Sequence, residues 1–380
     1  MFFSQVEGHL EIKKKLKQTV AQNRISHAQM FTGGEGGAAL PLAMAYARYI
    51  LCQNPSEDDS CGQCTSCKQI TAHSYPDLHY IYPVAQNKEV KDTKPTSDLF
   101  LKSWNELIDN QTYFDYMTWI SHIDVEKKNA EIKVREAENL SHQLALKSYS
   151  GQKRIIILWM AEKLRSQTAN KILKMVEEPP ADTIFLMVSH KPELVISTII
   201  SRCQLINVPR FTHEQIVSIL NAQPNGDPFM GEIAAALAEG NAALARNLVA
   251  NSEDYLKSSQ QFITWIRACF QAKTETLLDW SEALAKSPRE RIIDTLNYFG
   301  KILKTALNSH YQEVKSPFRI ESGFQLDKLA PYVHTANIPQ MLKDIEDTTY
   351  AISRNANAKI CLYDLSLNMS RLVRMKKAAS

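Results

Sequence analysis

The sequence lacks any apolar run close to the roughly 20 residues that a membrane-spanning helix needs. It also lacks a strong charge of either sign, since 44 Lys and Arg against 41 Asp and Glu give a net charge of +3. The N-terminal residues lead directly into polar sequence and have none of the apolar core of a secretion signal. These absences predict a cytoplasmic protein without a membrane segment, in which any nucleic-acid contact comes from local basic patches.

Internal repeats and long low-complexity segments are missing as well. What remains is ordinary for a globular protein, with 44% hydrophobic and 22% charged residues. A chain of 380 residues is longer than a single hydrophobic core usually supports, so we expect two or three domains. Because the cytoplasm is reducing, the cysteines are not expected to form structural disulfides.

The strongest fold signal lies in residues 153–203. Two apolar runs, 154–160 and 183–189, predict buried strands. The stretch between them has apolar side chains at helical spacing and ends at Pro179 and Pro180, which stop a helix. Strand, crossover helix and strand form the right-handed unit of a parallel α/β sheet.

A glycine-rich turn at residues 33–37 follows an apolar stretch and precedes a helix rich in alanine and leucine. These are the parts of a P-loop, whose pattern G-x-x-x-x-G-K-[ST] binds phosphate through backbone amides and the lysine. Aligned from Gly33, the last glycine, the lysine and the hydroxyl residue fall on Ala38, Ala39 and Leu40, so the cation and the magnesium ligand are both missing. Weak nucleotide binding through backbone amides is left open. The predicted degenerate loop consists of Gly33, Gly36, Gly37, Ala38, Ala39 and Leu40.

Four cysteines lie within sixteen residues, in the spacing C-x8-C-x2-C-x2-C. In a reducing compartment, thiolates this close are best explained by a tetrahedral Zn²⁺ ion, and the alternative is a set of incidental free cysteines. No water-activating glutamate is evident nearby, so we expect a closed, structural site. His73 follows soon after, but with four thiols present we expect it to be a turn or core residue. The predicted zinc ligands are Cys52, Cys61, Cys64 and Cys67.

Three short motifs carry a resemblance to a known family. They are Ala169-Asn170 with Lys174, the two glutamates and two prolines at 177–180, and Ser201-Arg202-Cys203. Together they resemble the signature of the bacterial clamp-loader AAA+ family, in which the cysteine spacing above is typical of a zinc module. The resemblance implies an α/β AAA+ domain with a RecA-like parallel sheet in residues 1–209 and a zinc module at 52–67. It also implies a small helical lid in 210–255 and a helical collar, or oligomerisation domain, in 256–380.

In that family the arginine of the Ser-Arg-Cys motif is a finger that acts in trans on ATP held by the neighbouring subunit. A planar, permanently charged guanidinium matches phosphate oxygens in a bidentate way. The resemblance therefore implies that Arg202 is a catalytic residue for a neighbour's ATP. The alternative is an ordinary surface cation at the end of a helix.

Residues that hydrolyse ATP in active members of the family are absent. The strand that carries their acidic pair ends here in Trp159 and Met160, which neither coordinate a hard cation nor accept a proton. Ala243 occupies the place of the nucleotide-sensing arginine of the lid, and Ser189 stands where a polar side chain normally faces the γ-phosphate. Loss of these residues with retention of Arg202 implies a subunit that donates a finger and hydrolyses nothing, with ATP bound only in neighbouring subunits.

The resemblance also implies partners. The chain would join delta and gamma/tau clamp-loader subunits of the bacterial replicative DNA polymerase in a ring of five, and help to load the sliding clamp on primed DNA, which it would bind weakly on its own. One alternative is an active gamma-type clamp-loader ATPase, which needs lysine at position 39 and acids at 159–160. Another is a zinc-containing nucleic-acid-binding adaptor outside any ring, which would bind DNA tightly as an isolated chain.

Residues 83–128 depart from the family pattern, because typical members connect the flanking elements with much less chain. Residues 100–123 are apolar enough to form one or two helices, and their aromatic side chains favour core or interface packing over stacking on single-stranded nucleic acid. We assign this insertion no role. A helix predicted from 132 to about 148 resembles the family helix whose start approaches the DNA backbone, where Lys133 and Arg135 would suit phosphate.

Overall fold

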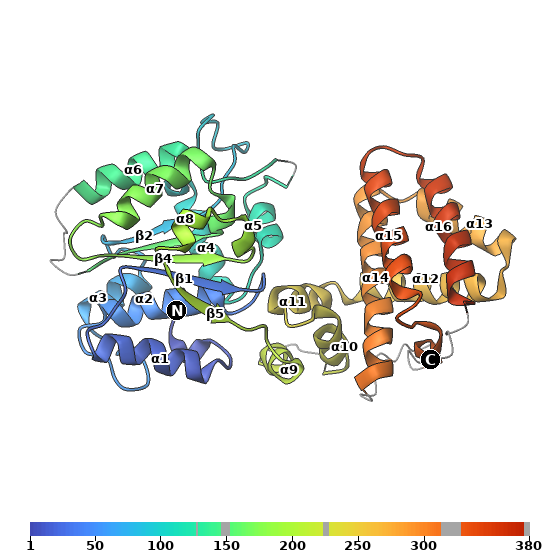
Figure 1. Cartoon of the computed structure of the whole chain (residues 1–380), viewed down its shortest axis with the longest axis horizontal. Helices are drawn as coiled ribbons and strands as arrows, with labels where there is room; N and C mark the ends of the chain where they lie inside the picture. Colours follow the sequence, from blue (N-terminus) through green and yellow to red (C-terminus); the bar gives the residue numbers. More distant parts are fainter. Residues whose placement is uncertain (127, 146–152, 223–227, 313–327, 376–380) are drawn as a thin grey trace. The chain divides into compact units, whose positions relative to one another are not determined.

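The computed structural model describes residues 1–126, 128–145, 153–222, 228–312 and 328–375 (Figure 1). The chain forms two compact units. The first contains Met1–Ile219 and Glu239–Leu244, and the second contains Leu220–Ala238 and Ala245–Ser380. The finer division at residues 209 and 255 stays a prediction. Within the described ranges, no helix is both long enough and apolar enough to cross a membrane.

The first unit is built on a parallel sheet of five strands in the order β2-β3-β4-β1-β5. The strands are β1 (Ala28–Gly33), β2 (Leu78–Ile81), β3 (Arg154–Trp159), β4 (Thr183–Ser189) and β5 (Gln204–Val208). The two apolar runs of the sequence are β3 and β4, which pair side by side with Ile156 opposite Phe185. The predicted α/β AAA+ fold is confirmed in this sheet.

Helices cover both faces of the sheet. They are α1 (Leu10–Ala21), α2 (Ala39–Leu51), α3 (Thr65–Thr71), α4 (Leu101–Asn110), α5 (Tyr116–His122), α6 (Val134–Ala145), α7 (Ser166–Glu177) and α8 (Ser197–Ile200). In Figure 1, α6 and α7 lie on one side of the sheet, and α1, α2 and α3 lie on the other. The crossover helix α7 does not follow β3 directly, because residues 161–163 form a 3-10 turn between them.

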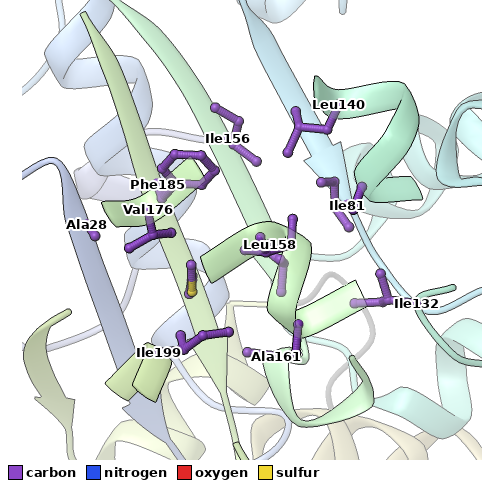
Figure 2. Close-up of a cluster of buried hydrophobic side chains, with 14 of the residues drawn as sticks. Ala28, Ile81, Ile132, Leu140, Ile156, Leu158, Ala161, Val176, Phe185 and Ile199 are labelled. Atoms are coloured by element: carbon purple, nitrogen blue, oxygen red, sulfur yellow. The ribbon is translucent and has the colours of Figure 1, made fainter. Parts of the chain in front are cut away.

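Side chains alternate between the two faces along each strand, so every second residue of β3 and β4 faces the helices α6 and α7. Ile156, Leu158, Phe185 and Met187 come from every second position of β3 and β4, and all are fully buried. They pack against α6 and α7 through residues such as Val176, as Figure 2 shows. The intervening residues of these strands are buried against the opposite face. Because both faces are covered, the strands appear in the sequence as continuous apolar runs.

The insertion at 83–128 contributes α4 and α5, in agreement with the prediction of one or two helices. Its tryptophans, Trp104 and Trp119, are completely buried. Trp104 stacks on Tyr82 at 4.1 Å between ring centroids and contacts Trp159 at 5.5 Å. The insertion therefore packs its aromatic side chains against the end of the sheet, which confirms core packing over stacking on nucleic acid.

The second unit is helical. Its elements are α10 (Pro228–Ala238), α12 (Ser252–Gln271), α13 (Thr274–Ala285), α14 (Arg289–Gln312), a 3-10 turn (Ala330–Tyr332), α15 (Ile338–Ser353) and α16 (Ala358–Val373). Two further helices, α9 (His213–Asn221) and α11 (Ala242–Ala250), cross the boundaries between the units. Trp265 of α12 lies at the centre, stacked on Trp280 and hydrogen-bonded through Nε1 to Ser366 at 2.9 Å. The helices after residue 252 thus belong to one helical unit, and its role as a collar stays a prediction.

Candidate functional site

The four predicted cysteine ligands come together. Cys52 follows α2, Cys61 lies in the connecting loop, and Cys64 and Cys67 lie at the start of α3. All four sulfur atoms lie within 4.8 Å of one another. Four ligands at the usual Zn–S distance of about 2.3 Å around a tetrahedral ion would be about 3.8 Å apart, so the quartet has the size of a zinc site.

Backbone hydrogen bonds and burial shift the pKa values of these thiols in opposite directions. The N–H groups of Cys64 and Gln63 lower the pKa of Cys61 to about 6, whereas burial raises the pKa of Cys67 to about 12. A divalent cation would reverse the second effect by stabilising the thiolate, so the donor set fits a metal such as zinc. His73 lies elsewhere: it has a positive φ of 52° and its Nε2 is 2.9 Å from a carboxylate oxygen of Asp109, as expected for a turn residue.

The glycine loop connects β1 to α2, as a P-loop would. Gly36 has φ +66°, and the N–H of Gly37 donates to the carbonyl of Gly34 at 3.2 Å, so this amide is turned into the loop itself. The three residues at the lysine end, Ala38, Ala39 and Leu40, are buried at 4% exposure or less. They supply neither a cation nor a hydroxyl group.

The residues just before and at the start of α11 lie directly on this loop. A Cβ atom at Gly36 would be 1.9 Å from Oδ1 of Asn241 and 2.9 Å from Cβ of Ala243. Asn241 Oδ1 also accepts the N–H of Leu244 at 2.9 Å, which caps α11. Position 243, where the resemblance places a missing arginine, therefore faces the loop with a methyl group.

Trp159 fills the ends of the central strands. Its ring is 1% exposed and contacts Trp104 and Phe114 of the insertion. Its Nε1 donates to Nε2 of His190 at 3.2 Å, and Nδ1 of His190 is 3.0 Å from the carbonyl oxygen of Gly33. Because the indole can only donate, His190 carries its proton on Nδ1 and links β3 and β4 to the end of β1.

Glu162 forms the second polar link in this region. Its carboxylate accepts the hydroxyl of Ser189 at 2.7 Å and the N–H of His190 at 3.1 Å. Ser189 is therefore already occupied by a residue of its own chain. Sequence reasoning missed both Glu162 and His190. The only signal for His190 was its position directly after the second apolar run, and Glu162 had no signal of this kind.

Arg202 lies just after α8 with its side chain 43% exposed. Its Nη2 is 2.6 Å from Oε1 of Glu177, the last residue of α7, and its Nη1 donates to the carbonyl of Thr198 at 3.2 Å. Two of the motifs singled out in the sequence thus meet in an ion pair, which their separation in the chain does not reveal.

The insertion contacts the start of α6. Nη1 of Arg135 is 2.6 Å from a carboxylate oxygen of Asp92, and Nζ of Lys133 donates to the carbonyl of Thr93 at 3.3 Å. Both cations considered for phosphate contact therefore already bind groups of their own chain. A DNA contact at this helix stays an untested prediction.

The sequence profile of a family described as DNA polymerase III, delta subunit, matches residues 8–212. The chain belongs to this family. The matched residues contain the cysteine quartet, the glycine loop, the insertion and Arg202, and they end just after β5.

Curated relatives carry similar names. The chain is 24% identical over 195 residues to DNA polymerase III subunit delta' of Bacillus subtilis, a match that covers 51% of this chain and 46% of that protein. It is 27% identical over 329 residues to subunit tau of the same organism, a match that covers 80% of this chain and 50% of that protein. It is 25% identical over 192 residues to delta' of Escherichia coli, a match that covers 50% of this chain and 45% of that protein. The chain thus spans about half the length of these relatives.

Among solved structures, a DNA polymerase III gamma subunit-related protein from Thermotoga maritima aligns with 95% of this chain and 99% of its own length. The identity is 12% and the TM-score is 0.39.

Proposed function

We propose that this member of the family is a clamp-loader subunit of the delta-prime type, which hydrolyses no ATP and supplies Arg202 to ATP bound by a neighbouring subunit. Its partners would be delta and gamma/tau subunits, the sliding clamp and primed DNA. Residues 210–255 would serve as a lid and 256–380 as the collar that closes the ring. The relatives named delta' and tau support membership in such an assembly.

The observation that carries the proposal is the contrast between a filled nucleotide site and an exposed arginine. Position 39 is alanine, and the strand that should end in acids ends in Trp159, which is packed among aromatic rings of the insertion. Asn241 lies against Gly36, where a nucleotide would need the loop to be open. Among the described residues, Ala39 leaves the phosphates without the P-loop lysine, and Trp159 and Met160 leave the attacking water without the acidic pair at the strand end.

Arg202 has the accessibility that a finger requires. In its pair with Glu177 the arginine side chain is 43% exposed and the glutamate side chain 36%, and pairs of this kind contribute only about 0–1 kcal/mol. A nucleoside triphosphate carries more negative charge than one carboxylate, and its phosphate oxygens accept two hydrogen bonds from one guanidinium. The phosphates of an adjoining subunit would therefore displace Glu177 at small cost.

The test is the ATPase activity of a loader reconstituted from this chain and its delta and gamma/tau partners. We expect Arg202→Ala to slow hydrolysis at the adjoining site by a factor of roughly 10³ or more, the range known for arginine fingers. Arg165→Ala is the matched control, because Arg165 is also an exposed arginine in an ion pair, with Glu131 at 2.5 Å. Turnover that is equal in both variants would refute the finger role.

We also propose that the cysteine quartet holds a structural Zn²⁺ ion through Cys52, Cys61, Cys64 and Cys67. The four sulfur atoms have the right number and separation, and four thiolates would complete the tetrahedral shell of the ion. The purified chain should contain one zinc per molecule by elemental analysis, and Cys64→Ser should lower that content. A metal-free wild-type chain would rule out the assignment.

The second candidate function is an active gamma-type ATPase. It is favoured by the match to tau, which covers 80% of this chain and extends beyond the first unit. It is opposed by Ala39, Trp159 and Met160, which replace the residues that such an enzyme needs. ATP turnover by the purified chain alone would decide for this candidate and against the first.

A further inference from the structure

Arg48 of α2 is a buried cation beside the cysteine quartet. The residue is 2% exposed. Its Nη2 donates to the carbonyl oxygen of Cys67 at 3.2 Å and to Oγ1 of Thr71 at 2.9 Å, and its guanidinium lies 3.9 Å from the ring centroid of Phe2. In the described part of the chain its Nε has no hydrogen-bond partner.

This guanidinium has no acidic partner among the residues that the structure describes. The nearby carboxylates are used elsewhere: Asp59 accepts the N–H groups of Phe3 and Ser4, and Asp109 binds His73. A charge that is removed from water without a counter-charge is strongly unfavourable. Two neutral acceptors and one aromatic face compensate for this only in part.

A zinc ion with four thiolates carries the missing charge. The ion contributes +2 and the thiolates −4, so the occupied quartet would have a net charge of −2. Arg48 reaches the quartet through the backbone of Cys67, which is both its hydrogen-bond partner and one of the ligand residues. The buried cation and the partly buried anionic cluster would then neutralise each other.

We propose that Arg48 is the counter-charge of the zinc–thiolate cluster and that it raises the affinity of the quartet for zinc. This inference rests on the proposed zinc site. Arg48 would act on the metal from outside the ligand shell, where the loss of such supporting residues typically weakens metal binding about 10- to 100-fold. It also joins the metal site to the N-terminal segment, since the guanidinium lies over the ring of Phe2, and Cζ of that ring would be 3.3 Å from a Cβ atom at Gly62.

The affinity of the full-length chain for Zn²⁺ tests the proposal, measured by competition with a chromogenic chelator. Arg48→Met removes the charge and should weaken zinc binding by about 10- to 100-fold. Arg48→Lys keeps the charge and should lose less. Thr71→Val is the matched control, because it removes a hydrogen-bond partner of Arg48 and leaves the charge in place, so we expect a change below about threefold.

A second measurement separates a charge effect from a merely structural one. With zinc bound, Arg48→Met should lower the melting temperature of the chain. After zinc is stripped by a chelator, the same substitution should raise it, because the unpaired buried cation is then gone. A structural role alone would give a loss of the same size in both states.

The inference is overturned if Arg48→Met binds zinc as tightly as the wild type, or if Thr71→Val weakens binding equally. Should Arg48→Met be insoluble, Arg48→Gln carries the same test, since it keeps a donor and lacks the charge. Absence of zinc from the wild-type chain would instead refute the metal site itself, so the two failures are distinguishable.

Discussion

Glu136 is a buried carboxyl group that joins α6 to the insertion. It is 6% exposed, and its Oε2 accepts the N–H of Ser97 at 2.8 Å. Burial raises its pKa from 4.5 to about 7, although the hydrogen bond from Ser97 acts in the opposite direction. Replacement by glutamine keeps the shape and the acceptor, and it removes the charge. Glu136→Gln therefore isolates the free energy of burying this carboxylate.

The direction in which pH changes the stability follows from proton binding by Glu136. The folded state holds the proton of Glu136 more tightly than the unfolded state. The contribution of Glu136 to the free energy of unfolding therefore falls as pH rises from about 4.5 to about 7, and it is constant above pH 7. A shift of about 2.5 pKa units at 1.36 kcal/mol each amounts to about 3 kcal/mol. We expect Glu136→Gln to stabilise the first unit by up to about 3 kcal/mol at pH 8, and to have little effect near pH 4.

Equilibrium urea denaturation at several pH values measures this difference, with hydrogen exchange of peptides from α6 reporting on the first unit alone. Glu138→Gln is the control on the same helix. Glu138 is exposed and hydrogen-bonds to Lys171 at 2.6 Å, which lowers its pKa, so its replacement should slightly destabilise the protein at neutral pH. Parallel pH profiles for the wild type and Glu136→Gln would show that the reasoning about burial is wrong.

Three further outcomes are expected. Trp159→Ala should destabilise the first unit by about 3–5 kcal/mol in urea denaturation, since the ring is fully packed, and it should not create ATPase activity. Asn241→Ala should cost about 1 kcal/mol by loss of the cap on α11, detected as faster hydrogen exchange in that helix, and calorimetry should show no gain in nucleotide binding over the wild type. Removal of zinc by a chelator should make residues 52–67 sensitive to proteolysis, with wild-type resistance restored by added Zn²⁺ and not restored in Cys64→Ser.

The elements that the sequence predicts well are those whose signal is local. Strands β3 and β4 are continuous apolar runs because helices cover both faces of the sheet, and the helix between them ends at two prolines. The cysteine quartet is predictable for the same reason, since its spacing alone limits how far apart the thiols can lie.

The features that were missed depend on contacts between distant parts of the chain. Strand β5 has only Val208 buried, with Gln204 and Leu205 exposed, so no apolar run marks it, and its pairing with β1 alone defines it. The link between His190 and Gly33 likewise follows from the fold, as does the burial of Arg48 away from any acidic partner in the part of the chain that the structure describes. Such facts have no signature at any fixed spacing in the sequence.

The packing of Trp159 limits which substitutions this end of the sheet can accept. Its ring is shared by the sheet and the insertion, so an aspartate at this position would leave a charged group and a void among Trp104 and Phe114. A lysine at 39 would gain nothing while the acid is missing, and the acid would be harmful while the insertion remains. Each single substitution toward an ATPase site is thus expected to be neutral or damaging, so building one here would need changes at position 39, at position 159 and in the insertion together.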